Sequence, residues 1–70
     1  MNIDKNLQEA LKRLIDFNNG KLMDKRIINE SICFIENSET NDSIFVDNRE
    51  YTNMNIRVIV SDANEKLNHL

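Results

Sequence analysis

The residues of this chain that could support nucleophilic or metal chemistry are one cysteine, Cys33, and one histidine, His69. A nucleophilic mechanism needs a thiol or hydroxyl held beside a base. His69 is the penultimate residue, and Cys33 falls within the apolar run Ile32–Ile35, which is typical of a buried thiol that acts as a small hydrophobic group. One Cys and one His are also too few for a conventional zinc site. We therefore expect no catalytic centre, no bound metal and no cofactor.

Carboxylate pairs can support general acid–base catalysis, but only in a desolvated cleft that separates their pKa values. The acidic residues here are interleaved with Asn, Ser and Thr, most densely in the stretch Glu36–Asp42, which favours hydrated side chains. The stretch Asp42–Glu50 lacks the positional pattern and the central glycine of an EF-hand calcium loop. The sequence therefore predicts a protein that is not an enzyme.

Formal charge is divided unevenly along the chain. Residues 1–35 hold six basic and five acidic residues, whereas residues 36–70 hold three basic and seven acidic ones, so the halves carry +1 and −4. Most charge runs are solvated surface that aids solubility, and acidic turns discourage association between sheet edges. The alternative hypothesis is that acidic side chains gather into one surface that binds a basic partner. That predicted acidic surface consists of Glu36, Glu39, Asp42, Asp47, Glu50 and Asp62.

Two other binding modes are open. Lys21, Lys25 and Arg26 lie close together in sequence and could line a helix-turn-helix surface of a small DNA-binding regulator. The acidic neighbours and the net charge of −3 dilute this basic cluster, because phosphate binding depends on a strong basic stripe. The third mode is an interaction module that binds through an apolar strand edge near Met54–Val60.

The predicted elements form one α+β domain over residues 1–70. Apolar residues at three-and-four spacing predict a helix over Asp4–Phe17, which Asn18-Asn19-Gly20 ends, whereas residues 21–30 fit either a short helix or the approach to a strand. Short strands are predicted over Ile32–Ile35 and Ser43–Val46, with turns at 37–42 and 47–50. The alternation in residues 53–61 predicts a third, half-buried strand, and Asp62 caps a short terminal helix over Ala63–His69. We expect the N-terminal helix to pack on a small three-stranded antiparallel sheet.

The length of 70 residues leaves a small core. Small domains often gain stability from disulfides, metals or a partner subunit, and the single cysteine leaves self-association, so a homodimer is plausible. No apolar run approaches the roughly 20 residues that span a bilayer, and the N-terminus lacks the features of a signal peptide. We expect a cytoplasmic protein that does not bind membranes.

In overall character, the chain resembles the small host-takeover proteins of bacteriophages. The resemblance consists of an Asn- and Ile-rich, cysteine-poor composition without enzyme motifs, together with the acidic turns Glu36–Asp42 and Asp47–Glu50. Among those proteins are dimeric DNA mimics that occupy the DNA-binding surface of nucleoid proteins such as HU. The resemblance implies an inhibitor whose acidic residues stand in for phosphates and block a basic host DNA-binding protein without touching DNA.

Overall fold

A computed structural model of the protein describes residues 3–38 and 43–70. Its elements are, in chain order, α1 (Ile3–Asn18), α2 (Lys25–Glu36), β1 (Ser43–Val46), β2 (Arg49–Thr52) and α3 (Asn53–Asn68). The expected mixture of helices and a small sheet is confirmed. The details differ, because within the described residues the sheet has two strands rather than three, and the last helix is long rather than short.

The first helix matches its prediction and ends where the sequence predicts. Gly20 adopts a φ of +106°, which side chains with a Cβ rarely adopt. This conformation lets the amide of Lys21 donate to the carbonyl of Asp16 at 2.9 Å and the amide of Gly20 donate to that of Phe17 at 3.0 Å. The exposed carbonyls at the end of α1 are thereby satisfied, as in other glycine-terminated helices.

The predicted strand over Ile32–Ile35 is wrong, because these residues form the second half of α2. Asp24 caps this helix by accepting a hydrogen bond from the Arg26 amide at 2.8 Å, and helical spacing then buries Ile28, Ile32 and Ile35 on one side. The run resembles a strand because Cys33 and Phe34, which lie between Ile32 and Ile35, are also apolar. Both are exposed, so the apparent apolar run joins two faces of one helix.

The predicted strand Ser43–Val46 is confirmed as β1, which pairs antiparallel with β2. The turn is shorter than the expected four residues. Only Asp47 and Asn48 form it, with φ of 50° and 66°, and two positive φ values in a two-residue loop define a type I′ turn. Residues 49 and 50 therefore belong to β2, and Ile44 and Val46 point into the core.

The predicted third strand over residues 53–61 and the predicted cap at Asp62 are both wrong, because α3 occupies Asn53–Asn68 without a break. Thr52 starts this helix through a capping box with Asn55: each side chain accepts from the backbone amide of the other. Along α3 the buried residues are Ile56, Val60, Ala63 and Leu67, which have helical spacing. The period of two came from Met54 and Val58, which are exposed on the other side of the helix.

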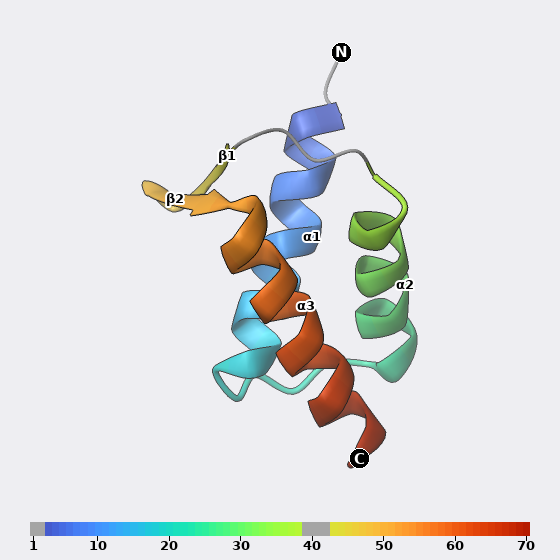
Figure 1. Ribbon diagram of the computed structural model, residues 1–70. Helices are drawn as coiled ribbons and strands as arrows, with labels where there is room; N and C mark the ends of the chain where they lie inside the picture. The colour runs from blue at the N-terminus through green and yellow to red at the C-terminus, as the bar shows by residue number, and fades with distance from the viewer. Residues whose placement is uncertain (1–2, 39–42) are drawn as a thin grey trace.

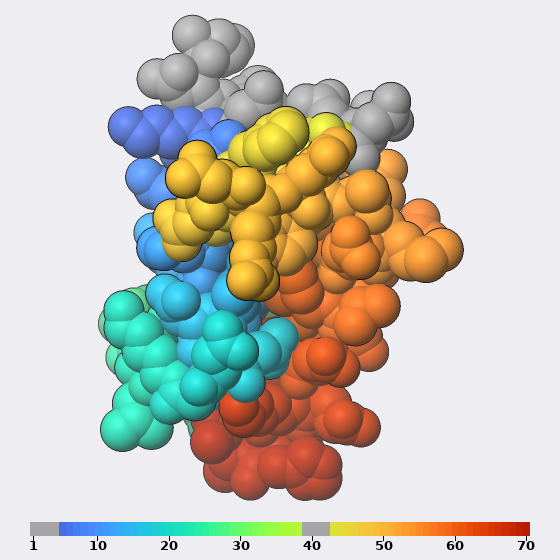
Figure 2. Space-filling model, turned by 90° about the vertical axis from the view of Figure 1, so that its left-hand side faces the viewer, coloured from blue at the N-terminus to red at the C-terminus, as the bar shows by residue number. Residues whose placement is uncertain are grey.

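The three helices form a bundle with the hairpin at one end (Figure 1). In Figure 1, α1 and α3 run in the same direction, and α2 runs opposite to both. Figure 2 shows the hairpin lying over the first half of α1 and beside the start of α3. The buried apolar side chains come from all three helices and from β1: they are Leu7, Ala10, Leu11, Leu14, Phe17, Ile28, Ile32, Ile35, Ile44, Val46, Ile56, Val60, Ala63 and Leu67.

Polar contacts fix the end of α1 against α3. The last turn of α1, which the structure describes in full, holds no basic residue, although a cation is favourable there. Lys66 of α3 supplies one: its Nζ donates to the carbonyls of Phe17 at 3.1 Å and Asn18 at 3.0 Å, and lies 5.5 Å from the centre of the Phe17 ring. Asn18 in turn donates through Nδ2 to the Ile59 carbonyl at 3.1 Å. These contacts set how α3 lies along α1.

Candidate protein-binding surfaces

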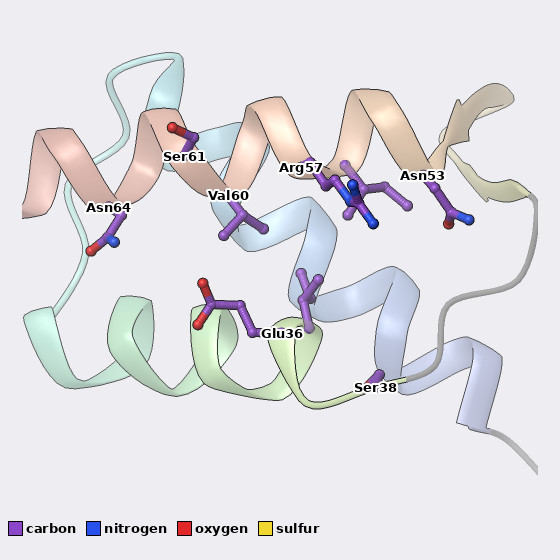
Figure 3. A pocket seen from close by; sticks show the side chains of 9 residues that line it. Glu36, Ser38, Asn53, Arg57, Val60, Ser61 and Asn64 are labelled. Carbon is purple, nitrogen blue, oxygen red and sulfur yellow. The ribbon is translucent and has the colours of Figure 1, made fainter.

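A groove of about 540 Å³ runs between α2 and α3 (Figure 3). Its floor consists of Ile35 from α2 and of Ile56 and Val60 from α3. These side chains are at most 7 % exposed, because α1 covers them from behind and the two helices cover them from the sides. The floor is therefore apolar but narrow, and most of the surface that a ligand would meet belongs to the rim.

The rim of this groove carries two opposite charges. Figure 3 shows Glu36 extending from the last turn of α2 toward α3, and Arg57 extending from α3 over the same groove. Both are exposed, and neither makes an ion pair or a hydrogen bond with any residue in 3–38 or 43–70. The remaining rim is polar and uncharged, with Ser61 and Asn64 on α3. Both charges are thus available to a binding partner.

A second, shallower hollow of about 490 Å³ lies between β2 and α3, where Glu50 and Tyr51 come close to Val58. Apolar side chains near it are unusually exposed: Val58 is 54 % exposed and Met54, one turn earlier, 75 % exposed. Phe45 is 56 % exposed and lies directly opposite Glu50 on the outer face of the hairpin. Exposed apolar side chains that form one patch mark an interaction site, so these three residues are candidates for such a site.

The structure disperses the predicted acidic surface. Glu36 lies at the end of α2, Glu50 on the hairpin and Asp62 in the second half of α3, roughly two and a half turns from the start of that helix. Asp62 lies one turn beyond Val58 on α3 and lines another hollow, together with Glu65, Lys66 and His69. The predicted residues Glu39 and Asp42 lie outside the described residues.

Among the predicted acidic residues that the structure describes, Asp47 forms an ion pair. Its carboxylate accepts a hydrogen bond from Lys12 Nζ at 2.6 Å, and the two charges form an exposed ion pair. This hydrogen bond, followed by the charge of Asp47, raises the pKa of Lys12 above its ordinary value. Asp47 therefore links the hairpin turn to α1, and its charge is already paired with that of Lys12.

The basic cluster lies at the opposite end of the bundle from the hairpin (Figure 1). Lys25 and Arg26 are exposed in the first turn of α2, and Lys21 Nζ lies 4.0 Å from the Asp16 carboxylate. Leu22, within the cluster, is 94 % exposed. α1 and α2 lie side by side in opposite directions here, which is the arrangement of a helical hairpin rather than the crossed pair of a helix-turn-helix.

The residues considered first for chemistry do not come together. Cys33 is exposed on α2, so the expectation of a buried core thiol is wrong, and His69 follows the end of α3. Across residues 3–38 and 43–70, the His, Cys, Asp and Glu side chains form no group of three or more that could hold a metal ion.

Sequence reasoning included Val58 in an apolar strand edge near Met54–Val60, but it missed that Val58 and Arg57 lie on a helix and line two different hollows. The alternation in residues 53–61 predicts a strand, in which side chains one residue apart point to opposite faces. On α3 the two side chains instead project about 100° apart around the helix, so Arg57 lines the α2–α3 groove and Val58 lines the hollow beside β2. The signal in the sequence that could have revealed this helix is Thr52 followed by Asn55, the pair that forms the capping box at its start.

Comparison of the chain with protein-family models, with curated proteins and with solved structures finds no match. In the part of the chain that the structure describes, every helix is too short or too polar to cross a bilayer.

Proposed function

We propose that this protein is a non-catalytic protein-binding domain that contacts a basic partner through the hairpin–α3 surface. This surface is defined by Phe45, Glu50, Met54, Val58 and Asp62. The observation that carries the proposal is that its three apolar side chains are each more than half exposed. Phe45 is paired with Glu50 across the hairpin, and Met54, Val58 and Asp62 follow one another at four-residue spacing on α3. The hollow that joins Glu50 to Val58 also contains one basic residue, Arg49. A cluster of exposed apolar residues bordered by charge is the composition of a protein interface, with an apolar centre and a polar rim.

The two kinds of side chain have different roles in such an interface. Burying a Val or Met side chain against a partner stabilises the complex by roughly 1.5–3 kcal/mol. The carboxylates of Glu50 and Asp62 contribute less to affinity, but they raise the association rate with a basic partner and exclude acidic ones. Ordinary salt concentrations screen this attraction within about 10 Å. We therefore expect binding that weakens with salt but does not vanish, because the apolar contact is insensitive to screening.

The proposed partner is a basic DNA-binding protein, which this domain blocks by occupying the DNA-binding surface. This choice rests on the acidic second half of the chain and on the resemblance to phage host-takeover proteins, and the placement of Glu50 and Asp62 beside an apolar centre is compatible with it. The geometry favours a mixed apolar and acidic contact over an extended array of phosphate-like charges, since Asp47 is already paired with Lys12.

The proposal is tested by measuring binding to a purified nucleoid protein, HU, at low and high salt. The test variant is Glu50→Lys/Asp62→Lys, and the matched control is Glu9→Lys/Glu30→Lys, which changes the net charge equally at exposed sites on α1 and α2. We expect wild type to bind, duplex DNA to compete, and the test variant to lose much more affinity than the control.

Three results would contradict parts of this proposal. Equal weakening by the two double variants shows that affinity follows net charge, which rejects the hairpin–α3 surface. Absence of HU binding at low salt rejects this partner class. Retardation of duplex DNA by the protein alone, lost on Lys25→Gln/Arg26→Gln, assigns the chain to the DNA-binding alternative. A further variant, Val58→Asn, separates the apolar contribution, because it leaves the charge unchanged.

A further inference from the structure

We infer that a second copy of this chain docks on the α2–α3 groove, and that Glu36 of each copy pairs with Arg57 of the other. The proposal starts from the two unpaired charges on the groove rim. It goes beyond the proposed function and does not depend on it, because the hairpin–α3 surface uses Val58 and its neighbours, whereas the groove uses the adjacent side of α3.

The position of the two charges makes the groove self-complementary. Because α2 and α3 run in opposite directions, the last turn of α2, which carries Glu36, lies beside the first half of α3, which carries Arg57 (Figure 1). In Figure 3 the Glu36 side chain extends toward Val60 and Arg57 lies nearer Asn53, so the two charges leave each other unpaired across one groove. A two-fold axis parallel to the helices and above the groove places α2 of one copy over α3 of the other. It also preserves position along the groove, so the turn that carries Glu36 in each copy faces the turn that carries Arg57 in the other, within reach of these two long side chains, and both contacts form at once.

The rest of the rim admits this arrangement. Ser61 and Asn64, which line the groove on α3, have short side chains, so a helix can approach to the usual interaxial distance of roughly 8–10 Å. In this dimer, α2 and α3 of one copy form a layer that packs on the same two helices of the other copy, and each α1 lies on the outside. An uncharged partner helix would leave Glu36 and Arg57 unpaired within the interface, whereas a second copy satisfies both, which is why we choose this occupant.

The area required is modest. A standard interface buries about 800 Å² on each partner, which is about a sixth of the 5103 Å² surface of this chain. A domain of 70 residues has a small core, and a partner subunit is one of the few sources of added stability for a chain with a single cysteine. Dimerisation through the groove would also leave both hairpin–α3 surfaces free, one on each copy.

The experiment uses the full chain and two charge-reversed variants, Glu36→Arg and Arg57→Glu, in sedimentation equilibrium from micromolar to millimolar concentration. We expect wild type to dimerise and each variant alone to dimerise about tenfold more weakly or worse, because like charges then meet twice across the axis. An equal mixture of the two variants should regain dimers, as a heterodimer. One of its two contacts keeps the original Glu36–Arg57 pair, and the other joins the two introduced charges, which are opposite in sign. The control is Glu65→Arg, an exposed acid on α3 outside the groove, which should leave the dimer unchanged.

Several results would overturn the inference. The inference is rejected if the wild-type protein stays monomeric at millimolar concentration. It is also rejected if the protein dimerises but neither Glu36→Arg nor Arg57→Glu weakens the dimer. A mixture that stays monomeric, although each variant alone is monomeric and folded by circular dichroism, rejects the reciprocal pairing. The variant with both reversals in one chain gives a second check, because its self-association should match wild type.

Discussion

Replacement of Lys66 by methionine tests whether one side chain holds the end of α1 against α3. In the native protein the Lys66 ammonium group donates to the carbonyls of Phe17 and Asn18, at 3.1 and 3.0 Å, and lies 5.5 Å from the centre of the Phe17 ring. Methionine keeps most of the aliphatic stem of Lys66, so the substitution removes mainly the charge and its hydrogen bonds.

The expected magnitude follows from the contacts. Each partly exposed hydrogen bond contributes about 0.5–1 kcal/mol. The charge near the C-terminus of α1 adds about 0.5 kcal/mol, and its position over the Phe17 ring adds about 0.5 kcal/mol. We therefore expect Lys66→Met to lower the free energy of unfolding by about 2–3 kcal/mol, which corresponds to a fall of about 8–24 °C in Tm for a chain of this size.

The assay is urea and thermal unfolding followed by circular dichroism, with Arg13→Met as the matched control. Arg13 is an exposed cation on α1 for which no hydrogen bond or ion pair is found among the described residues. Its replacement should change stability by less than about 0.5 kcal/mol. If Lys66→Met is as stable as Arg13→Met, the ammonium group does not cap α1, and our account of how α3 is positioned fails.

Three further predictions concern local features of the fold. Asp24→Ala should cost about 1 kcal/mol of stability by removing the cap of α2, and Asp24→Ser should restore most of it; equal stability of all three proteins in urea would reject the cap. Gly20→Ala should cost about 1–2 kcal/mol because of the positive φ, although the added Cβ meets no neighbour; an unchanged unfolding midpoint would show that the turn relaxes freely. Asp47→Asn should lower the pKa of Lys12 toward its ordinary value in an NMR titration of the lysine side chain. Since the folded-state pKa of Lys12 is raised, the stability that this pair contributes is complete below the unfolded-state pKa and is lost as pH rises through the folded-state value, so Asp47→Asn should also remove that alkaline loss.

Part of the fold follows directly from local sequence signals. The helix over Ile3–Asn18 could be predicted because its apolar residues keep helical spacing and Gly20 ends it. The strand Ser43–Val46 and the start of a turn at Asp47 could be predicted, because Asp47 and Asn48 tolerate positive φ, but the predicted turn was two residues too long. These signals need no information from the rest of the chain.

The predictions for the second half of α2 and for residues 53–61 of α3 are wrong for a common reason, whereas the helix predicted over Ala63–His69 matches the last part of α3, with His69 as its C-cap. In each case exposed apolar residues, Phe34 on α2 and Met54 with Val58 on α3, lie between buried ones and imitate a strand pattern. A buried and an exposed apolar residue are indistinguishable in the sequence, so periodicity alone cannot separate the two patterns. The exposure that misled the prediction is the same property that makes Val58 a candidate binding residue.

The candidate sites depended on tertiary structure for a different reason. The sequence by itself determined that acidic charge is concentrated in residues 36–70, that the chemistry-bearing residues are few, where α1 ends, and that a turn follows Val46. Only the packing of the helices decided that Asp47 pairs with Lys12, 35 residues away, and that Lys66 caps a helix almost 50 residues earlier. Packing also decided that Glu36 and Arg57 share one groove. Charge is a property of each residue, but a binding surface is a property of distances between residues, and those distances exist only once the chain has folded.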